Sequence, residues 1–166
     1  MQRTVLVILM FMIIGLFLST PQAWAAGSLP ATDISGPVNF TLNDLDSKAV
    51  SIAAYRGKKP VLLIFWTSWC PYCLIGLRDL NQKYPGLQRS GFDVLAINAG
   101  ESRDKAARVA KDYELKFKVL LDIDQETVGY FRVVGIPLYV LLNKQGEVVF
   151  RDNRYPADEI AKRSAR

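Results

Sequence analysis

The sequence contains no histidine and only two cysteines, Cys70 and Cys73, among its 166 residues. A structural zinc site needs about four nitrogen or sulfur ligands, and these residues do not supply them. Covalent haem attachment requires a histidine directly after the second cysteine of such a pair, where Leu74 stands. We therefore expect no metal, no haem and no separate cofactor.

Charge gives little indication of a partner. Lysine and arginine number 21 against 16 aspartates and glutamates, a formal net charge of +5, and an excess of this size rarely decides what a protein binds. No cluster combines basic and aromatic side chains as a nucleic-acid interface does. No internal repeat or low-complexity segment is present either. Nucleic acid is therefore not expected as a partner.

An apolar run, Val5 to Leu18, follows the basic Arg3 and precedes the small-x-small triplet Ala23-Trp24-Ala25. This pattern predicts an export signal. The run is shorter than the roughly 20 residues of a membrane-spanning helix, which favours cleavage over the alternative of a retained anchor. The predicted division of the chain is a signal peptide over 1–25, a linker over 26–36 and one domain over 37–166.

The predicted domain alternates between strand and helix patterns. Val61 to Trp66 is continuously apolar, as in a central strand buried on both faces. Short alternating segments before it predict a β-hairpin. The segments concerned are the hairpin strands 40–42 and 50–52, later strands 92–98, 117–121, 138–142 and 147–151, and helices 102–114 and 124–131. This order indicates an α/β fold, a three-layer α/β/α sandwich around a mixed sheet.

A further helix is predicted around the cysteine pair. Apolar residues recur there at spacings of four, three and four, which places them on one helix face. The helix is expected to begin at Pro71, with Cys70 as its N-cap, and to end near Pro85-Gly86. The residues on the shared face are Cys73, Leu77, Leu80 and Tyr84.

Two cysteines separated by two residues suit a disulfide that opens and closes. A thiol attacks a disulfide as the thiolate, and a helix N-terminus stabilises that anion at Cys70. We therefore expect Cys70 to attack a partner's disulfide and Cys73, one turn further on, to resolve the mixed disulfide. A purely structural disulfide is the alternative, but a bridge across so few residues constrains little of the unfolded chain.

Three segments carry a resemblance to a known family. They are 65–73 (FWTSWCPYC), 135–137 (GIP) and 141–146 (LLNKQG). These segments resemble the thioredoxin superfamily, and they look most like its exported TlpA/ResA-type thiol-disulfide oxidoreductases. The resemblance extends over about residues 38–151. It implies a thioredoxin fold with an N-terminal β-hairpin and a central βα insertion between Asn98 and Leu121.

The resemblance also implies a substrate site around the cysteines. Pro137 is expected to be cis and to lie against them, with an ordinary trans proline as the alternative. The backbone of Ile136 is expected to pair with a bound substrate strand. Trp69, Pro71 and Tyr72 are expected beside the reactive sulfur, where they would contact the substrate.

Two departures from the family concern proton transfer. Ile64 stands where thioredoxins commonly have a buried aspartate, and Gly76 stands where TlpA/ResA-type proteins often have a glutamate. Burial without a carboxylate should make Cys73 harder to deprotonate. One hypothesis is that Glu101, just past the end of the second central strand, acts as a substitute proton relay. The alternative is a solvated loop carboxylate.

The leading functional prediction is a periplasmic or extracytoplasmic reductase, membrane-anchored if the signal is uncleaved. It would receive electrons from a transmembrane thiol carrier and reduce disulfides of exported proteins. Apocytochrome c is one substrate that the resemblance suggests. The direction, reduction over oxidation, rests on the resemblance alone.

Two other functions fit parts of the sequence. A thiol peroxidase is suggested by Thr67, three residues before Cys70 as in peroxiredoxins, although their proline is replaced by Leu63. In this reading Cys70 is the peroxidatic thiol. A non-catalytic thioredoxin-fold binding module is also open, because a groove beside Ile136 and Pro137 can bind extended segments without proton transfer.

Overall fold

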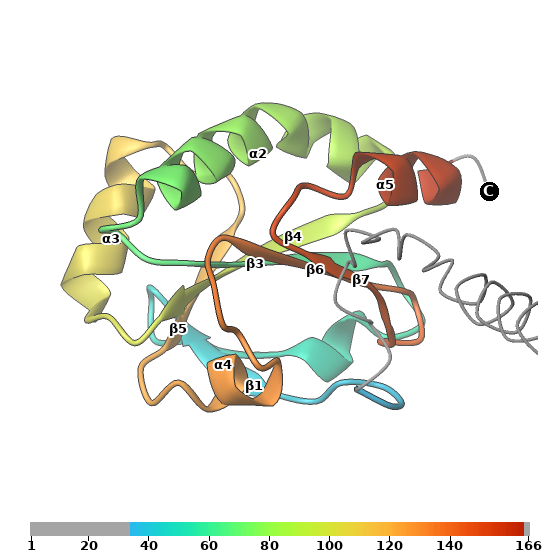
Figure 1. Cartoon of the computed structure of the whole chain (residues 1–166), viewed down its shortest axis with the longest axis horizontal. Coiled ribbons are helices and arrows are strands. Elements are labelled where there is room, and N and C mark those ends of the chain that lie inside the picture. The colour runs from blue at the N-terminus through green and yellow to red at the C-terminus, as the bar shows by residue number, and fades with distance from the viewer. Residues whose placement is uncertain (1–33, 165–166) are drawn as a thin grey trace, which may run out of the picture.

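A seven-stranded mixed sheet forms the centre of the molecule (Figure 1). The computed structural model describes residues 34–164, so the predicted signal peptide and most of the predicted linker lie outside the described residues. Within residues 34–164, no helix has the length and apolar character needed to cross a membrane. The strands are β1 (Thr41–Asp44), β2 (Ala49–Ser51), β3 (Val61–Trp66), β4 (Asp93–Ala99), β5 (Lys118–Asp122), β6 (Leu138–Leu142) and β7 (Val148–Asp152).

The strand order, β2-β1-β5-β4-β3-β6-β7, brings four chain segments to one edge of the sheet. β3, β4 and β5 run parallel, and β6 runs antiparallel to β3. The ends of β3, β4 and β5 at Trp66, Ala99 and Asp122 therefore lie at the same edge as the start of β6 at Leu138. The loops at this edge carry the cysteines, Glu101 and Pro137.

Helices cover both faces of the sheet (Figure 1). Along β3, Leu62, Ile64 and Trp66 face one helical layer and the alternate residues face the other, as strand geometry requires. All six residues of β3 are buried, which confirms it as a central strand. One layer consists of α2 (Pro71–Arg89), α3 (Arg103–Asp112) and α5 (Ala157–Ser164), and the other of the 3₁₀ helix η3 (Ile52–Tyr55) and α4 (Glu126–Tyr130). The predicted three-layer α/β sandwich is therefore confirmed, as is the N-terminal hairpin of β1 and β2.

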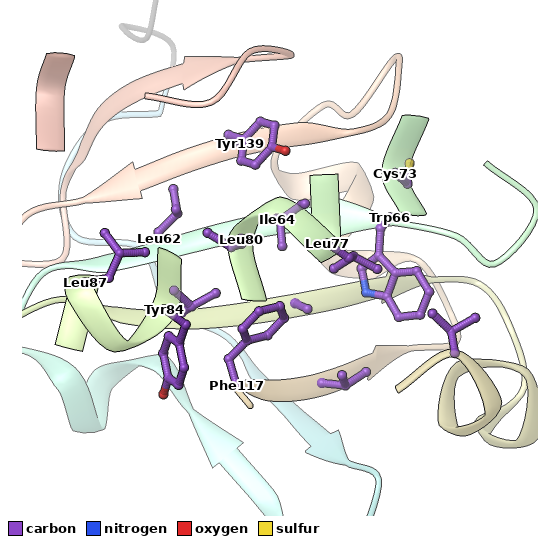
Figure 2. Close-up of a cluster of buried hydrophobic side chains, with 14 of the residues drawn as sticks. Leu62, Ile64, Trp66, Cys73, Leu77, Leu80, Tyr84, Leu87, Phe117 and Tyr139 are labelled. Atoms are coloured by element: carbon purple, nitrogen blue, oxygen red, sulfur yellow. The ribbon is translucent and has the colours of Figure 1, made fainter. Parts of the chain in front are cut away.

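The core under α2 fixes the helix on the sheet (Figure 2). Leu77, Leu80 and Tyr84 of α2 are buried together with Leu62 and Ile64 of β3. Each fully buried leucine contributes about 1.5–3 kcal/mol relative to an exposed one. The predicted apolar face of the helix is confirmed. This packing sets the position of the helix N-terminus, where the cysteines lie.

Three predicted helices have wrong boundaries, and the one predicted over 102–114 spans only Arg103–Asp112. α2 does not end near Pro85 but continues to Arg89, because Leu87 extends the apolar face and is buried in the core. The helix predicted over 124–131 is shorter, with Gln125 rather than Asp124 as N-cap. The structure also has a C-terminal helix, α5, whose Ile160 packs into the same core as α2. Burial of Leu87 in α2 and of Ile160 in α5 against the sheet, a tertiary effect, favours the helical turns that the sequence did not predict.

Candidate active site

Cys70 and Cys73 form a disulfide at the start of α2. β3 ends at Trp66, and a short loop leads to Cys70, which adopts the extended N-cap conformation before Pro71 at the first helical position. The Cα atoms of the two cysteines are 5.2 Å apart. The backbone N–H of Cys73 donates to the Sγ atom of Cys70 over 3.2 Å. A negative charge on Cys70 would therefore be stabilised by this N–H and by the helix dipole.

The residues around the disulfide differ in their exposure. Cys73 is fully enclosed, whereas 5% of Cys70 is accessible. Trp69 and Tyr72 are 70% and 77% exposed and stand on either side of the Cys70-Pro71 step in the sequence. Exposed tryptophan and tyrosine rings offer a large apolar area with a polar tip, which suits contact with a partner protein. Cys70 is therefore the sulfur that a second protein can reach, and two aromatic rings flank it.

The Gly135-Ile136-Pro137 segment packs against Cys70. The Ile136-Pro137 peptide bond is cis, and the carbonyl oxygen of Ile136 lies 3.8 Å from the Sγ atom of Cys70. The side-chain amide of Asn153 donates to the carbonyl oxygens of Gly135 and Pro137, over 3.1 and 2.7 Å. These bonds hold the segment on both sides of Ile136. Sequence reasoning missed Asn153, because no local pattern distinguishes it.

Glu101 is buried and fixes the loop before the cysteines. Its Oε2 atom accepts the Ser68 backbone N–H over 2.6 Å and the Asn98 side-chain amide over 2.8 Å. Its Oε1 atom accepts the Ser68 hydroxyl over 2.6 Å. Burial opposes ionisation of Glu101, but the hydrogen bonds from Ser68 and Asn98 and the charge of Lys105 outweigh it and lower the pKa of the carboxyl. Within residues 34–164, none of its hydrogen bonds goes to Cys70 or Cys73.

The two positions without a carboxylate face each other, Ile64 from β3 and Gly76 from α2 above it. Ile64 is fully buried in β3. A Cβ atom at Gly76 would lie 3.7 Å from the Cδ1 atom of Ile64 and would overlap the hydroxyl oxygen of Tyr139. The space that a larger side chain at position 76 would need is therefore occupied by the phenol of Tyr139, which comes from β6.

A groove of about 530 Å³ adjoins the disulfide loop. It is lined by Thr67 and Trp69 and the segment from Val133 to Ile136, together with residues 99–102, Lys105, Gln125 and Val128. Val134 is 88% exposed. Within residues 34–164, no group of three or more acidic, cysteine or histidine side chains is placed to hold a metal ion.

Comparison with known proteins identifies the family. The AhpC/TSA family matches residues 36–151. The thiol-disulfide oxidoreductase ResA of Bacillus thuringiensis subsp. konkukian is 32% identical over 111 residues, which span 67% of this chain and 64% of that protein. ResA of Bacillus subtilis is 30% identical over 142 residues, or 86% of this chain and 79% of that protein.

A solved structure agrees with these matches. A secreted disulfide oxidoreductase of Mycobacterium tuberculosis, homologous to DsbE of Escherichia coli, superposes with a TM-score of 0.64 at 25% identity, covering 76% of this chain and 94% of that one. The fold and the cysteine pair thus define a member of the thioredoxin superfamily. The chain belongs to the AhpC/TSA family within it, alongside the ResA-type thiol-disulfide oxidoreductases. The resemblance expected from the sequence is confirmed.

Proposed function

We propose that this protein is an extracytoplasmic thiol-disulfide oxidoreductase that reduces disulfides of exported proteins. The observation that carries the proposal is the Cys70–Cys73 disulfide at the N-terminus of α2, with the Ile136 carbonyl oxygen beside Cys70. Membership alongside proteins named ResA supports it. The reaction uses the two sulfur atoms and needs no other redox group.

The reaction begins with the reduced pair. The Cys70 thiolate, stabilised by the Cys73 N–H and the helix dipole, attacks one sulfur of the substrate disulfide. That S–S bond breaks, the first substrate thiolate leaves and takes a proton, and a mixed disulfide joins Cys70 to the substrate. Cys73 then loses its proton and attacks the Sγ atom of Cys70. The Cys70–Cys73 bond forms, the second substrate thiol leaves, and two electrons have passed to the substrate.

The substrate would lie across the exposed side of Cys70. We assign contacts with it to Trp69, Pro71 and Tyr72 at the start of α2 and to Ile136 and Pro137 across from them. Asn153 occupies the carbonyl oxygens of Gly135 and Pro137 but not that of Ile136, which supports pairing between Ile136 and an extended segment.

The partners follow from the location that we propose. Export through residues 1–25, with the domain from residue 37 onward, would place the protein outside the cytoplasm, and the related M. tuberculosis protein is secreted. A transmembrane thiol carrier would reduce the Cys70–Cys73 disulfide after each turnover. Apocytochrome c, whose paired cysteines must be reduced before haem attachment, is a fitting substrate.

Insulin reduction tests the activity. The wild-type protein with a chemical reductant should accelerate insulin precipitation, and Cys70→Ser should abolish the effect.

Trapping of partners tests the exchange mechanism. Cys73→Ser, expressed in the original organism with its signal intact, should accumulate mixed disulfides on Cys70 that mass spectrometry identifies. Activity that persists in Cys70→Ser, or no trapped partner above that control, would exclude the exchange mechanism. Full insulin-reducing activity of the wild type that disappears in Cys70→Ser would also exclude a protein that only binds.

Equilibration of the Cys70–Cys73 disulfide with glutathione buffers tests the direction of electron transfer, since a strongly oxidising reduction potential would contradict a reductase.

Thiol peroxidase activity is the second candidate. The hydroxyl of Thr67, three residues before Cys70, is enclosed and has no hydrogen-bond partner within residues 34–164. Such a hydroxyl could donate to a peroxide oxygen at Cys70. The Cys70 thiolate would attack one peroxide oxygen and break the O–O bond, which forms a sulfenic acid and releases water or an alcohol. Cys73 would then condense with the sulfenic acid, forming the disulfide and releasing a second water. Peroxide consumption by the reduced protein faster than by free thiol would favour this function over disulfide reduction.

A further inference from the structure

The loop between α4 and β6, residues 131–137, lines part of the groove and brings Ile136 to the sulfur of Cys70. Of residues 132–137 none is buried, so apolar packing alone holds this loop weakly. Within residues 34–164, no backbone–backbone hydrogen bond outside the helices and strands involves residues 134–137. Backbone groups without such bonds need side chains or water as partners. The side chains that bond to these carbonyl groups therefore decide where Ile136 lies.

Arg151 of β7 holds the start of the 131–137 loop. Its Nε and Nη2 atoms donate to the carbonyl oxygen of Phe131 over 3.3 and 3.0 Å. The Nη2 atom also donates to the carbonyl oxygen of Arg132 over 2.7 Å. Hydrogen bonds from a charged donor are about twice as strong as those between neutral groups. Phe131 is itself buried in the core, so the loop starts from a fixed point.

Asn153, directly after β7, holds the end of the loop. An amide side chain has two N–H donors, and that of Asn153 donates to the carbonyl oxygens of Gly135 and Pro137 over 3.1 and 2.7 Å. The carbonyl oxygen between them, that of Ile136, lies 3.8 Å from the Sγ atom of Cys70. Asn153 is exposed, so its hydrogen bonds contribute more than its packing. One side chain thus fixes the carbonyl groups on both sides of the one that faces the sulfur.

The residues that hold the loop are tied to the same sheet as the cysteine. Arg151 pairs with Val140 of β6. β6 in turn pairs with β3, whose last residue, Trp66, precedes the short loop to Cys70. Because strand pairing fixes these segments relative to one another, the 131–137 loop has a defined position beside Cys70 before any substrate arrives. A site held in this way loses less conformational freedom when a ligand binds.

We propose that Arg151 and Asn153 are positioning residues for protein substrates, which hold the 131–137 loop ready to bind an extended polypeptide segment beside Cys70. This inference rests on the proposed function, because it concerns the substrate site of the same exchange. Without the two side chains, binding of the segment must also order the loop, and that cost falls on affinity. A small disulfide that reaches Cys70 without filling the groove does not need the loop.

Steady-state reduction of insulin tests the role. Asn153→Ala should raise KM for insulin about tenfold and keep kcat within about twofold, because the loop takes up the same position once substrate is bound. The small disulfide DTNB reacts at Cys70 without filling the groove, so the release of thionitrobenzoate by the reduced protein should keep its wild-type rate. Amide hydrogen exchange in residues 132–137 should be faster in the variant than in the wild type.

Two further variants serve as comparisons. Asn153→Asp keeps the shape of the side chain but cannot donate at neutral pH, so it should match Asn153→Ala. Arg154→Gln, at the adjacent exposed position where the guanidinium bonds to Asp152, should behave as the wild type.

The outcomes separate this role from the proposed function. Failure of the wild type to reduce insulin would contradict the proposed function. Loop exchange in Asn153→Ala as slow as in the wild type, or an unchanged KM for insulin, would overturn the positioning role. Equal losses with insulin and DTNB would also overturn it, because they would place the effect at the sulfur and not at the loop.

Discussion

The carboxylate of Glu101 holds Ser68 by two hydrogen bonds, one from its backbone N–H and one from its hydroxyl, both 2.6 Å long. Ser68 is two residues before Cys70, so the loop from β3 to Cys70 is fastened to the loop after β4. Hydrogen bonds to an ionised group contribute about 1.5–3 kcal/mol each. The hydrogen bonds of Glu101 thus favour a role in positioning the loop. The proton-relay role predicted from its place in the sequence is a second hypothesis.

Glu101→Gln should destabilise the protein by about 1–3 kcal/mol at neutral pH, because the neutral amide cannot accept from all three donors. The fold lowers the pKa of Glu101, so its contribution is present above the unfolded pKa of about 4.3 and is lost as pH falls through the folded pKa. Urea unfolding should therefore show the largest gap between variant and wild type near neutrality and a smaller gap in acid.

Glu114→Gln, an exposed glutamate, is the matched control and should show neither effect. Turnover distinguishes the two roles of Glu101. If it only positions the loop, the variant slows insulin reduction without moving the pH profile. If the pH profile of insulin reduction by Glu101→Gln lacks one ionisation that the wild type shows, the result would instead support the proton relay.

Gly76 and Tyr139 should be coupled in stability. Gly76→Ala would normally stabilise a helix by about 1 kcal/mol, but its Cβ overlaps the Tyr139 hydroxyl, and overpacking of this kind costs about 1–3 kcal/mol. In the Tyr139→Phe background the overlap is relieved, so the same substitution should become neutral or stabilising. A double-mutant cycle by urea unfolding measures this coupling.

Gly86→Ala provides the control within the same helix. A Cβ atom there meets only an Arg89 nitrogen, at 3.9 Å, so this substitution should stabilise by about 0.5–1 kcal/mol in either background. Equal effects of Gly76→Ala with and without the Tyr139 hydroxyl would contradict the close approach.

Much of the site follows from local pattern. The apolar run of β3, the helical spacing after Cys73 and the preference of Pro71 for the first helical position together predict where the cysteines lie. These signals depend on residues a few positions apart, which sequence shows directly. The fold class follows from the same alternation of periods.

The remaining features depend on contacts between distant segments. Asn153 reaches Gly135 and Pro137 only because β7 pairs with β6. Tyr139 reaches Gly76 only because the register of β6 on β3 places it beneath α2. Neither register can be derived from the spacing of residues in one segment. The sequence therefore showed that position 76 has no carboxylate, but not that the phenol of Tyr139 occupies the space there.

Asp122 should respond to pH in the direction opposite to Glu101. It is fully buried at the end of β5 and accepts the backbone N–H groups of Thr127 and Val128, over 3.2 and 2.7 Å, at the start of α4. Burial is the main cause of its raised pKa, against the hydrogen bonds from Val128 and Thr127. A carboxyl with a raised folded pKa stabilises the fold below its unfolded pKa and loses that contribution as pH rises through the folded value.

Asp122→Asn cannot ionise, so its stability relative to the wild type should increase as pH rises from about 4 to neutrality. Urea unfolding midpoints across this range measure the trend. Asp112→Asn removes a negative charge from an exposed position that is not among the groups that shift the pKa of Asp122, and it controls for the general effect of net charge. A gap between Asp122→Asn and wild type that stays constant with pH would contradict the raised pKa.

Val134 should matter for large substrates and not for small ones. Its side chain is almost fully exposed at the rim of the groove that runs from Trp69 to Ile136. A bound protein segment would cover it, and covering a valine contributes about 1.5 kcal/mol or more. Val134→Ser should therefore lower kcat/KM for insulin about tenfold, while the rate with DTNB and the stability stay unchanged. Val134→Ile, which keeps an apolar surface, should retain full activity. Equal losses with insulin and DTNB would mean that the substitution disturbs the disulfide itself, and no loss with either would place the substrate outside this groove.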